Sequence, residues 1–106
     1  MLFAEGKIIM DERYVITEEE KKKILEVYFK QGIDERLDVF PSKEKRKLIV
    51  MQNISRHFEP SIIYSEMEVN EILKAIYSDF AILRRYLIDY GFIERSRDCT
   101  KYWVKD

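Results

Sequence analysis

The order of apolar and polar positions predicts four helices, with short strands near the two ends of the chain. Two β-prone runs, at 8–10 and 14–16, flank a polar Asp-Glu-Arg and fit a small hairpin or an arm. Thr17 and the three glutamates after it form a capping box, which predicts a helix that ends near Gln31, before Gly32. A polar connector at 34–40 separates this helix from the rest of the chain.

Start and stop signals define three further helices. Ser42 is the predicted N-cap of a helix that runs to about Phe58, and Ser65 opens a short third helix with a second capping box. Ser78 is the predicted cap of a fourth helix, which ends at Gly91. The core of that helix is predicted by apolar residues at steps of four and three: Ile76, Phe80, Leu83, Leu87 and Tyr90.

The end of the chain alternates as a β-hairpin, with strands at 92–95 and 100–104 around the polar turn 96–99. Helix, helix, short turn, helix and hairpin is the order of elements in a winged helix-turn-helix domain. We therefore expect a mainly α fold with a small β-hairpin. Residues 41–106 would form the winged helix-turn-helix domain, and residues 1–40 an N-terminal arm and helix that pack on it.

Composition narrows the classes of function. The 106 residues, of which 46% are hydrophobic and only three are Gly, fit one folded domain. The longest apolar run is far below the roughly 18 residues that a membrane span needs, and charges at Glu5 and Lys7 interrupt any signal-peptide core. One Cys and one His are too few for a zinc site or a disulfide framework, and the isolated glycines form no phosphate-binding loop. We expect a cytoplasmic protein with no membrane contact, cofactor, metal or enzymatic activity.

Several segments from Thr17 onward follow the pattern of a known family. They are Phe40-Pro41-Ser42-Lys43-Glu44-Lys45-Arg46-Lys47, Phe58-Glu59-Pro60, Tyr64-Ser65-Glu66, Glu68-Val69-Asn70-Glu71-Ile72-Leu73, Asp79-Phe80-Ala81, Leu83-Arg84-Arg85-Tyr86-Leu87, Asp89-Tyr90-Gly91-Phe92 and Tyr102-Trp103. In these segments the chain resembles the bacterial domain of unknown function two thousand eighty-seven, which occurs alone or behind an ArsR-type helix-turn-helix domain. The resemblance implies a winged-helix-like fold and suggests transcriptional regulation. Cys99 stands where the family more often has Gly, and Ile82 where Thr is usual.

The predicted fourth helix, at 79–90, would enter the major groove of DNA. A helical wheel places Arg85 opposite the apolar stripe, with Arg84 at its border. Ser78 and Ile82 flank Arg85 on the same side. The other interpretation of Arg85 is a solvated side chain that pairs with Asp89 four residues later.

Two groups of cations are candidates for phosphate contacts. The first stands at the start of the second helix, where the helix dipole disfavours positive charge: Lys43, Lys45, Arg46 and Lys47. Its alternative is neutralisation by the acidic residues Asp34, Glu35 and Asp38. The second group lies in the predicted wing, 95–101: Arg95, Arg97 and Lys101. The other interpretation of this group is that its charges protect the edge of the hairpin from edge-to-edge pairing with another strand.

The net charge of -1 conceals an uneven distribution along the chain. Residues 1–40 carry 7 basic and 10 acidic side chains, whereas residues 41–106 carry 12 and 10. The sequence therefore predicts a DNA-binding transcriptional regulator of the winged-helix type, acting on double-stranded DNA as a homodimer. The alternative is a winged-helix protein-interaction module without DNA binding, which the near-neutral charge and two apolar residues expected on the surface, Ile82 and Ile88, would favour. Sensing through Cys99 is a third hypothesis.

Overall fold

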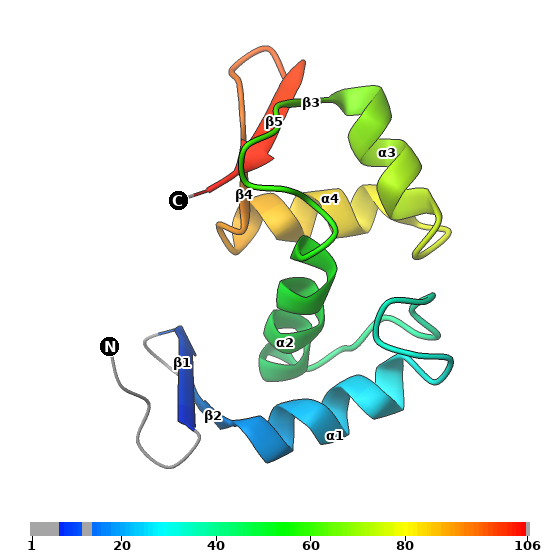
Figure 1. The fold of residues 1–106 in the computed structure, drawn as a ribbon, viewed down its shortest axis with the longest axis vertical. Coiled ribbons are helices and arrows are strands. Elements are labelled where there is room, and N and C mark those ends of the chain that lie inside the picture. Colours follow the sequence, from blue (N-terminus) through cyan, green and yellow to red (C-terminus); the bar gives the residue numbers. More distant parts are fainter. Residues whose placement is uncertain (1–6, 12–13, 106) are drawn as a thin grey trace.

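The computed structural model describes residues 7–11 and 14–105 and shows a mainly helical chain with a small three-stranded antiparallel sheet (Figure 1). A two-stranded ribbon precedes the helices. In chain order the described elements are β1 (Lys7–Asp11), β2 (Tyr14–Thr17), α1 (Glu18–Tyr28), α2 (Glu44–Ser55), β3 (Tyr64–Ser65), α3 (Glu66–Lys74), α4 (Phe80–Asp89), β4 (Ile93–Arg95) and β5 (Lys101–Val104).

The two capping boxes proposed from the sequence differ in how fully they form. The Thr17 hydroxyl accepts a hydrogen bond from the Glu20 amide at 3.0 Å, which starts α1. At α3 the box is reciprocal, because the Glu68 amide donates to Ser65 Oγ at 3.1 Å and the Ser65 amide donates to Glu68 Oε1 at 2.8 Å. Each bond satisfies a backbone donor that the helix itself leaves without an acceptor.

Three predicted boundaries of the first two helices are wrong. Helix α1 ends at Tyr28 rather than near Gln31, because Phe29 leaves the helix to become buried and the Asp38 carboxylate accepts from the Lys30 amide at 2.7 Å. Helix α2 begins at Glu44, so that Lys43 and not Ser42 is its N-cap. It also ends at Ser55 instead of continuing to about Phe58.

Helix α4 is capped by Asp79 rather than by Ser78. The Asp79 Oδ1 atom accepts from the Ile82 amide at 3.3 Å, and the first helical residue is Phe80. A capping side chain reaches the second or third helical amide only from the residue directly before the helix, and Ser78 stands one position too early.

The C-terminal hairpin forms as predicted and gains a third strand. β4 and β5 are antiparallel, with Ile93 opposite Val104 and Arg95 opposite Tyr102. β3 pairs with the other edge of β5, which gives the order β3-β5-β4. This strand was not predicted, because two residues are too few to show strand periodicity. Near the N-terminus, β1 and β2 form the small antiparallel ribbon that the sequence indicated.

One hydrophobic core connects the N-terminal segment with the rest of the chain. Ile16 and Leu25 are buried in the same cluster as Ile49 of α2 and Leu83 of α4. The connector is attached to the fold by its backbone, since the Leu37 amide donates to the Ile76 carbonyl at 2.9 Å. Helix α1 is therefore attached to the rest of the fold by core packing as well as by the chain that connects it to α2 (Figure 1).

The expected surface positions of Ile82 and Ile88 are wrong. Both side chains are partly buried and pack against the hydrophobic core. Helix α4 is only ten residues long and has neighbours on more than one side, so that its core-facing surface is wider than a single stripe. These two isoleucines therefore do not form an exposed apolar surface.

Candidate nucleic-acid interface

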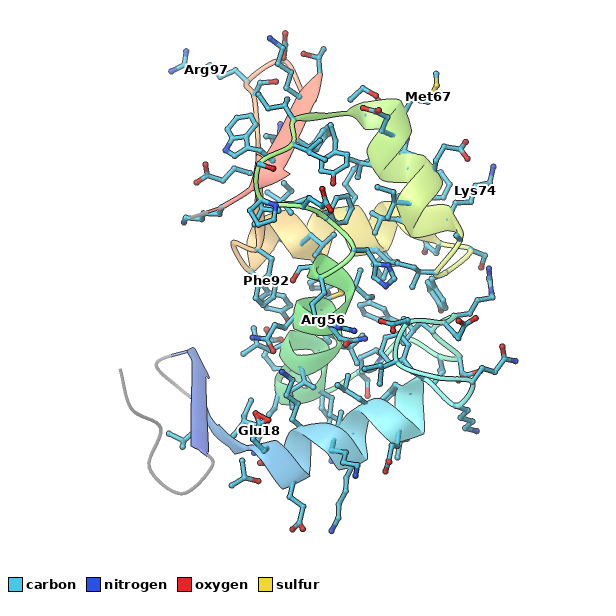
Figure 2. The ribbon with its side chains drawn as sticks, viewed as in Figure 1. Glu18, Arg56, Met67, Lys74, Phe92 and Arg97 are labelled. Atoms are coloured by element: carbon cyan, nitrogen blue, oxygen red, sulfur yellow. The ribbon has the colours of Figure 1, made fainter. Side chains whose placement is uncertain are left out.

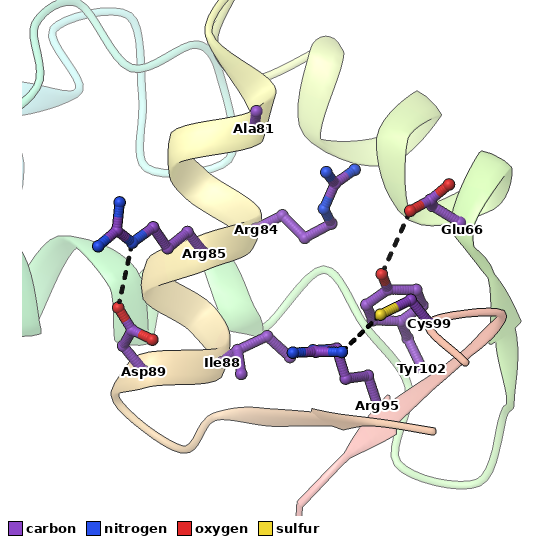
Figure 3. Close-up of a pocket in the computed structure, with 9 residues that line it drawn as sticks. All are labelled: Glu66, Ala81, Arg84, Arg85, Ile88, Asp89, Arg95, Cys99 and Tyr102. Atoms are coloured by element: carbon purple, nitrogen blue, oxygen red, sulfur yellow. Dashed lines mark hydrogen bonds and ion pairs between the residues drawn. The ribbon is translucent and has the colours of Figure 1, made fainter. Parts of the chain in front are cut away.

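An open groove of about 270 Å³ separates α4 from the β4–β5 hairpin and the start of α3 (Figure 3). Three of the lining side chains are arginines. Arg84 and Arg85 come from α4, and Arg95 comes from the end of β4. The remaining lining residues are Glu66, Ala81, Ile88, Asp89, Cys99 and Tyr102. The α4–hairpin groove is thus the place where the fold brings separate predicted site residues together.

Two of the three arginines are held by neighbouring side chains. Arg84 donates through Nη1 to Oδ1 of Asn70 on α3. Nη1 of Arg95 contacts the sulfur of Cys99 across the hairpin turn. The first contact joins α4 to α3, and the second lies within the hairpin, so each guanidinium group has a partner beside the groove.

Tyr102 lies at the base of the groove and its hydroxyl points toward α3. The hydroxyl donates to Glu66 at 3.5 Å. Burial raises the pKa of the Tyr102 hydroxyl above its ordinary value of 10.0, and the positive charge of Arg84 opposes that shift. Tyr102 therefore stays neutral at physiological pH and contributes shape and a hydroxyl rather than charge.

Arg85 differs from the other two arginines in its partner, which belongs to the same helix. Its side chain is 79% exposed, and its Nε atom lies 3.6 Å from Oδ2 of Asp89. Figure 3 shows this pair on the outer side of α4. The helical wheel placed Arg85 on the exposed face correctly, and the pairing with Asp89 proposed as its alternative is also present.

The turn of the β4–β5 hairpin is ordered by a hydrogen-bond network around Asp98. The carboxylate accepts from the Ser96 hydroxyl at 2.6 Å and from the Thr100 hydroxyl at 2.8 Å. These bonds, with that of Ser96 the strongest, lower the pKa of Asp98 from 3.8 to about 2. The turn presents exposed Arg97 and Lys101, and Figure 2 shows Arg97 directed away from the body of the molecule.

The basic cluster at the start of α2 lies elsewhere. Lys45 Nζ forms an ion pair with Glu20 Oε2 of α1 at 2.6 Å. Arg46 donates to the Tyr28 hydroxyl at 3.4 Å. With exposed Lys43, these cations line a second groove of about 490 Å³ between α1 and α2.

Lys47 points to a different side of α2. Its Nζ atom donates to the Tyr86 hydroxyl at 3.3 Å and lies 5.0 Å from the centre of the Tyr86 ring. The cluster that is continuous in sequence is therefore divided in space, since consecutive helical positions point in different directions.

The acidic partners proposed for this cluster are also wrong. Asp34 pairs with Arg56 at 2.9 Å, and Asp38 caps the Lys30 amide. The carboxylate that reaches the cluster belongs to Glu20, in the preceding helix. Figure 1 shows that the start of α2 lies beside α1, away from the turn of the hairpin.

The eleven predicted DNA-contacting residues thus fall on separate surfaces. Arg84, Arg85 and Arg95 line the α4–hairpin groove, with Arg97 and Lys101 on the adjacent hairpin. Ser78 is exposed just before α4, and Ile82 packs on the core. Sequence reasoning missed Glu66 and Asn70, because only the packing of α3 in the fold brings Glu66 to the groove and Asn70 to Arg84.

The fold and the groove define a small, mainly helical domain with an arginine-lined groove beside its C-terminal sheet. Residues 36–104 match the model of a family described as uncharacterized proteins conserved in bacteria (DUF2087), and the chain belongs to this family. No curated protein and no solved structure matches the chain. Within the described residues, the helices are too short or too polar to cross a membrane, and no cluster of His, Cys, Asp and Glu is suited to a metal ion.

Proposed function

We propose that the protein is a cytoplasmic transcriptional regulator of the winged-helix type that binds double-stranded DNA. Helix α4 enters the major groove, and the β4–β5 hairpin contacts the phosphate backbone. The observation that carries this proposal is the α4–hairpin groove, where arginines from a helix and a strand face one open space. Arginine is the residue best suited to bind both phosphates and base edges.

The topology supports the same assignment. From α2 onward the order is helix, strand, helix, helix and hairpin, and the sheet order is β3-β5-β4. A short connection at 75–79 joins α3 to α4, as in a helix-turn-helix motif, where the second helix is the one that reads DNA. In this assignment α4 is the recognition helix and the β4–β5 hairpin is the wing.

The distribution of charge suggests how the contacts are divided. Arg97 and Lys101 extend from the hairpin into solvent, where phosphates could reach them without any change in the core. Such contacts position the protein on DNA, whereas the exposed side of α4 is the surface that reads base edges. The cations at the start of α2 lie outside this surface, and in this proposal they stabilise the contact between α1 and α2.

A salt titration of binding to duplex DNA of random sequence tests the proposal. The wild-type chain should bind at about 50 mM salt, and the logarithm of its affinity should fall linearly with the logarithm of the salt concentration. Replacing Arg97 and Lys101 together by Ala should make the slope shallower by about two. Fluorescence anisotropy of a labelled duplex measures both quantities.

The double variant Lys45→Ala/Arg46→Ala is the matched control. It removes the same charge from the groove between α1 and α2 and should leave the slope unchanged. Undetectable binding of the wild-type chain at about 50 mM salt would contradict DNA binding. A slope that responds only to Lys45 and Arg46 would move the interface to α2.

Three exposed apolar side chains around β3 favour a second candidate function, a winged-helix protein-interaction module that joins two copies or binds another protein. Ile62, Ile63 and Met67 are 40%, 64% and 74% exposed and stand close together in sequence, before β3 and in the first turn of α3. Exposed apolar groups in one region are typical of protein interfaces. Sedimentation of the wild type beside Ile63→Glu and Met67→Glu variants tests this function, which predicts an oligomer that the substitutions dissociate.

A further inference from the structure

We infer that Arg85, oriented by Asp89, recognises a guanine in the major groove of duplex DNA. This inference rests on the proposed DNA binding and specifies the sequence preference that such binding would have. It starts from the difference between the three arginines of the α4–hairpin groove. Arg84 is half-buried and donates to Asn70, and Arg95 is exposed but contacts the Cys99 sulfur, so each of these guanidinium groups already has a partner on another part of the chain.

The terminal nitrogens of Arg85 are available to bind a group outside the chain. Its Nε edge faces the Asp89 carboxylate at 3.6 Å. Among the residues that the structure describes, its two terminal nitrogens have no hydrogen-bond partner, and the side chain is 79% exposed. A guanidinium carries five N–H donors in a rigid fork, so a carboxylate on one edge orients the donors on the other.

Guanine is the base that matches two parallel donors. Its major-groove edge presents two neighbouring acceptors, N7 and O6, whereas adenine presents one acceptor and one donor. A bidentate contact of this kind distinguishes the correct base from the others by about 5- to 150-fold. Exposed Ala81 lies one turn before Arg85 and also lines the groove, so that a small side chain stands beside the approach to a base edge.

Helix stability does not explain the position of Asp89. Asp89 is the last residue of α4, where the helix dipole disfavours negative charge. In addition, an arginine followed by an acid four residues later is the less favourable order for an ion pair on a helix. An acid on this surface would also repel DNA phosphates, so it lowers affinity for DNA in general. By orienting Arg85, Asp89 increases the difference in affinity between the correct DNA sequence and other sequences. This gain in specificity offsets the costs to helix stability and to overall affinity.

Selection of bound sequences from duplexes with a randomised centre tests the inference on the full chain. The wild type should enrich a guanine at one position of the selected sites. Arg85→Ala should lose that enrichment, and Arg85→Gln should change the preferred base to adenine, whose N6 and N7 atoms fit a glutamine amide. Asp89→Asn should lower the discrimination for guanine several-fold while overall affinity stays equal or rises. A purely structural Asp89 would leave the base preference unchanged.

Arg97→Ala is the control for loss of one positive charge, and it should weaken binding to all sequences equally. Thermal unfolding of each variant confirms that the fold is retained. DNA binding without any base preference, or a guanine preference that persists in Arg85→Ala, would overturn the assignment of Arg85 and leave the proposed function intact. An unchanged preference in Asp89→Asn would overturn the orienting role of Asp89. Absence of all DNA binding would overturn both the inference and the proposed function.

Discussion

Cys99 adopts a backbone conformation that favours glycine. Among the described residues it is the one non-glycine with a positive φ, at +62°. A side chain in the left-handed region costs roughly 1–2 kcal/mol, part of which glycine loses again through the larger entropy of its unfolded chain. The resemblance described above implies Gly at this position, and glycine is the residue that adopts a positive φ without strain.

We expect Cys99→Gly to raise the free energy of unfolding by about 0.5 kcal/mol, because it removes this strain. Cys99→Ser retains the strain without the thiol, so it should unfold like the wild type. Urea denaturation followed by circular dichroism measures the three proteins. A Gly variant less stable than the wild type would show that the contact between Arg95 and the Cys99 side chain outweighs the strain.

Asp98 gives the hairpin turn a dependence on pH. Its pKa is lowered from 3.8 to about 2, so its contribution to stability is fully present above pH 4 and disappears as the pH falls through about 2. The carboxyl chemical shift of Asp98 should therefore titrate with a midpoint near 2. Because the bond from Ser96 is the main cause, Ser96→Ala should move the midpoint toward 3.8. A wild-type midpoint near 3.8 would contradict the network.

At the scale of elements, α2 begins without a side-chain cap. Lys43 holds the N-cap position and has no acceptor, whereas Thr17, Ser65 and Asp79 cap the other three helices of the described structure. A serine at an N-cap stabilises a helix by about 0.5–2 kcal/mol relative to a residue that cannot cap. A capping side chain at position 43 would therefore make the start of α2 more stable.

We expect Lys43→Ser to raise the free energy of unfolding by about 1 kcal/mol. Ser42→Ala serves as the control and should change it by less than about 0.5 kcal/mol, because Ser42 lies outside the helix and is exposed. Chemical denaturation measures both variants. If Ser42→Ala were the more disruptive change, Ser42 would act as the cap after all.

The elements show how far sequence patterns determine this fold. Capping boxes and alternating strands act between neighbouring residues, which is why the starts of α1 and α3 and the C-terminal hairpin were predicted correctly. The strand β3 and the partial burial of Ile82 depend on contacts between distant segments, which no local pattern shows. The same applies to the site. Exposure of Arg85 follows from helical geometry, but the partner of Lys45 belongs to another helix.

At the scale of the whole molecule, the N-terminal segment and the family-matched region share one core. The matched region begins at residue 36, yet Ile16, Leu25, Tyr28 and Phe29 belong to the same buried cluster as α2 and α4. Removing a buried side chain of this size costs about 2–5 kcal/mol. Together, the four residues contribute a free energy comparable to the entire free energy of unfolding of a domain, about 5–15 kcal/mol.

A chain that starts at residue 36 should therefore fail to fold cooperatively, although it contains the whole matched region. Its circular dichroism should show reduced helix content, and its urea transition should be broad or absent. The control is Leu25→Ala in the full chain, which removes one of these contacts and should lower the free energy of unfolding by about 2–5 kcal/mol while the transition stays cooperative. A cooperative transition of the truncated chain, with the same midpoint as the full chain, would show that α1 packs on the domain without contributing to its stability. The expected failure would instead mean that the domain needs α1 for its core, and that the ion pair between Glu20 and Lys45 lies at a contact on which folding depends.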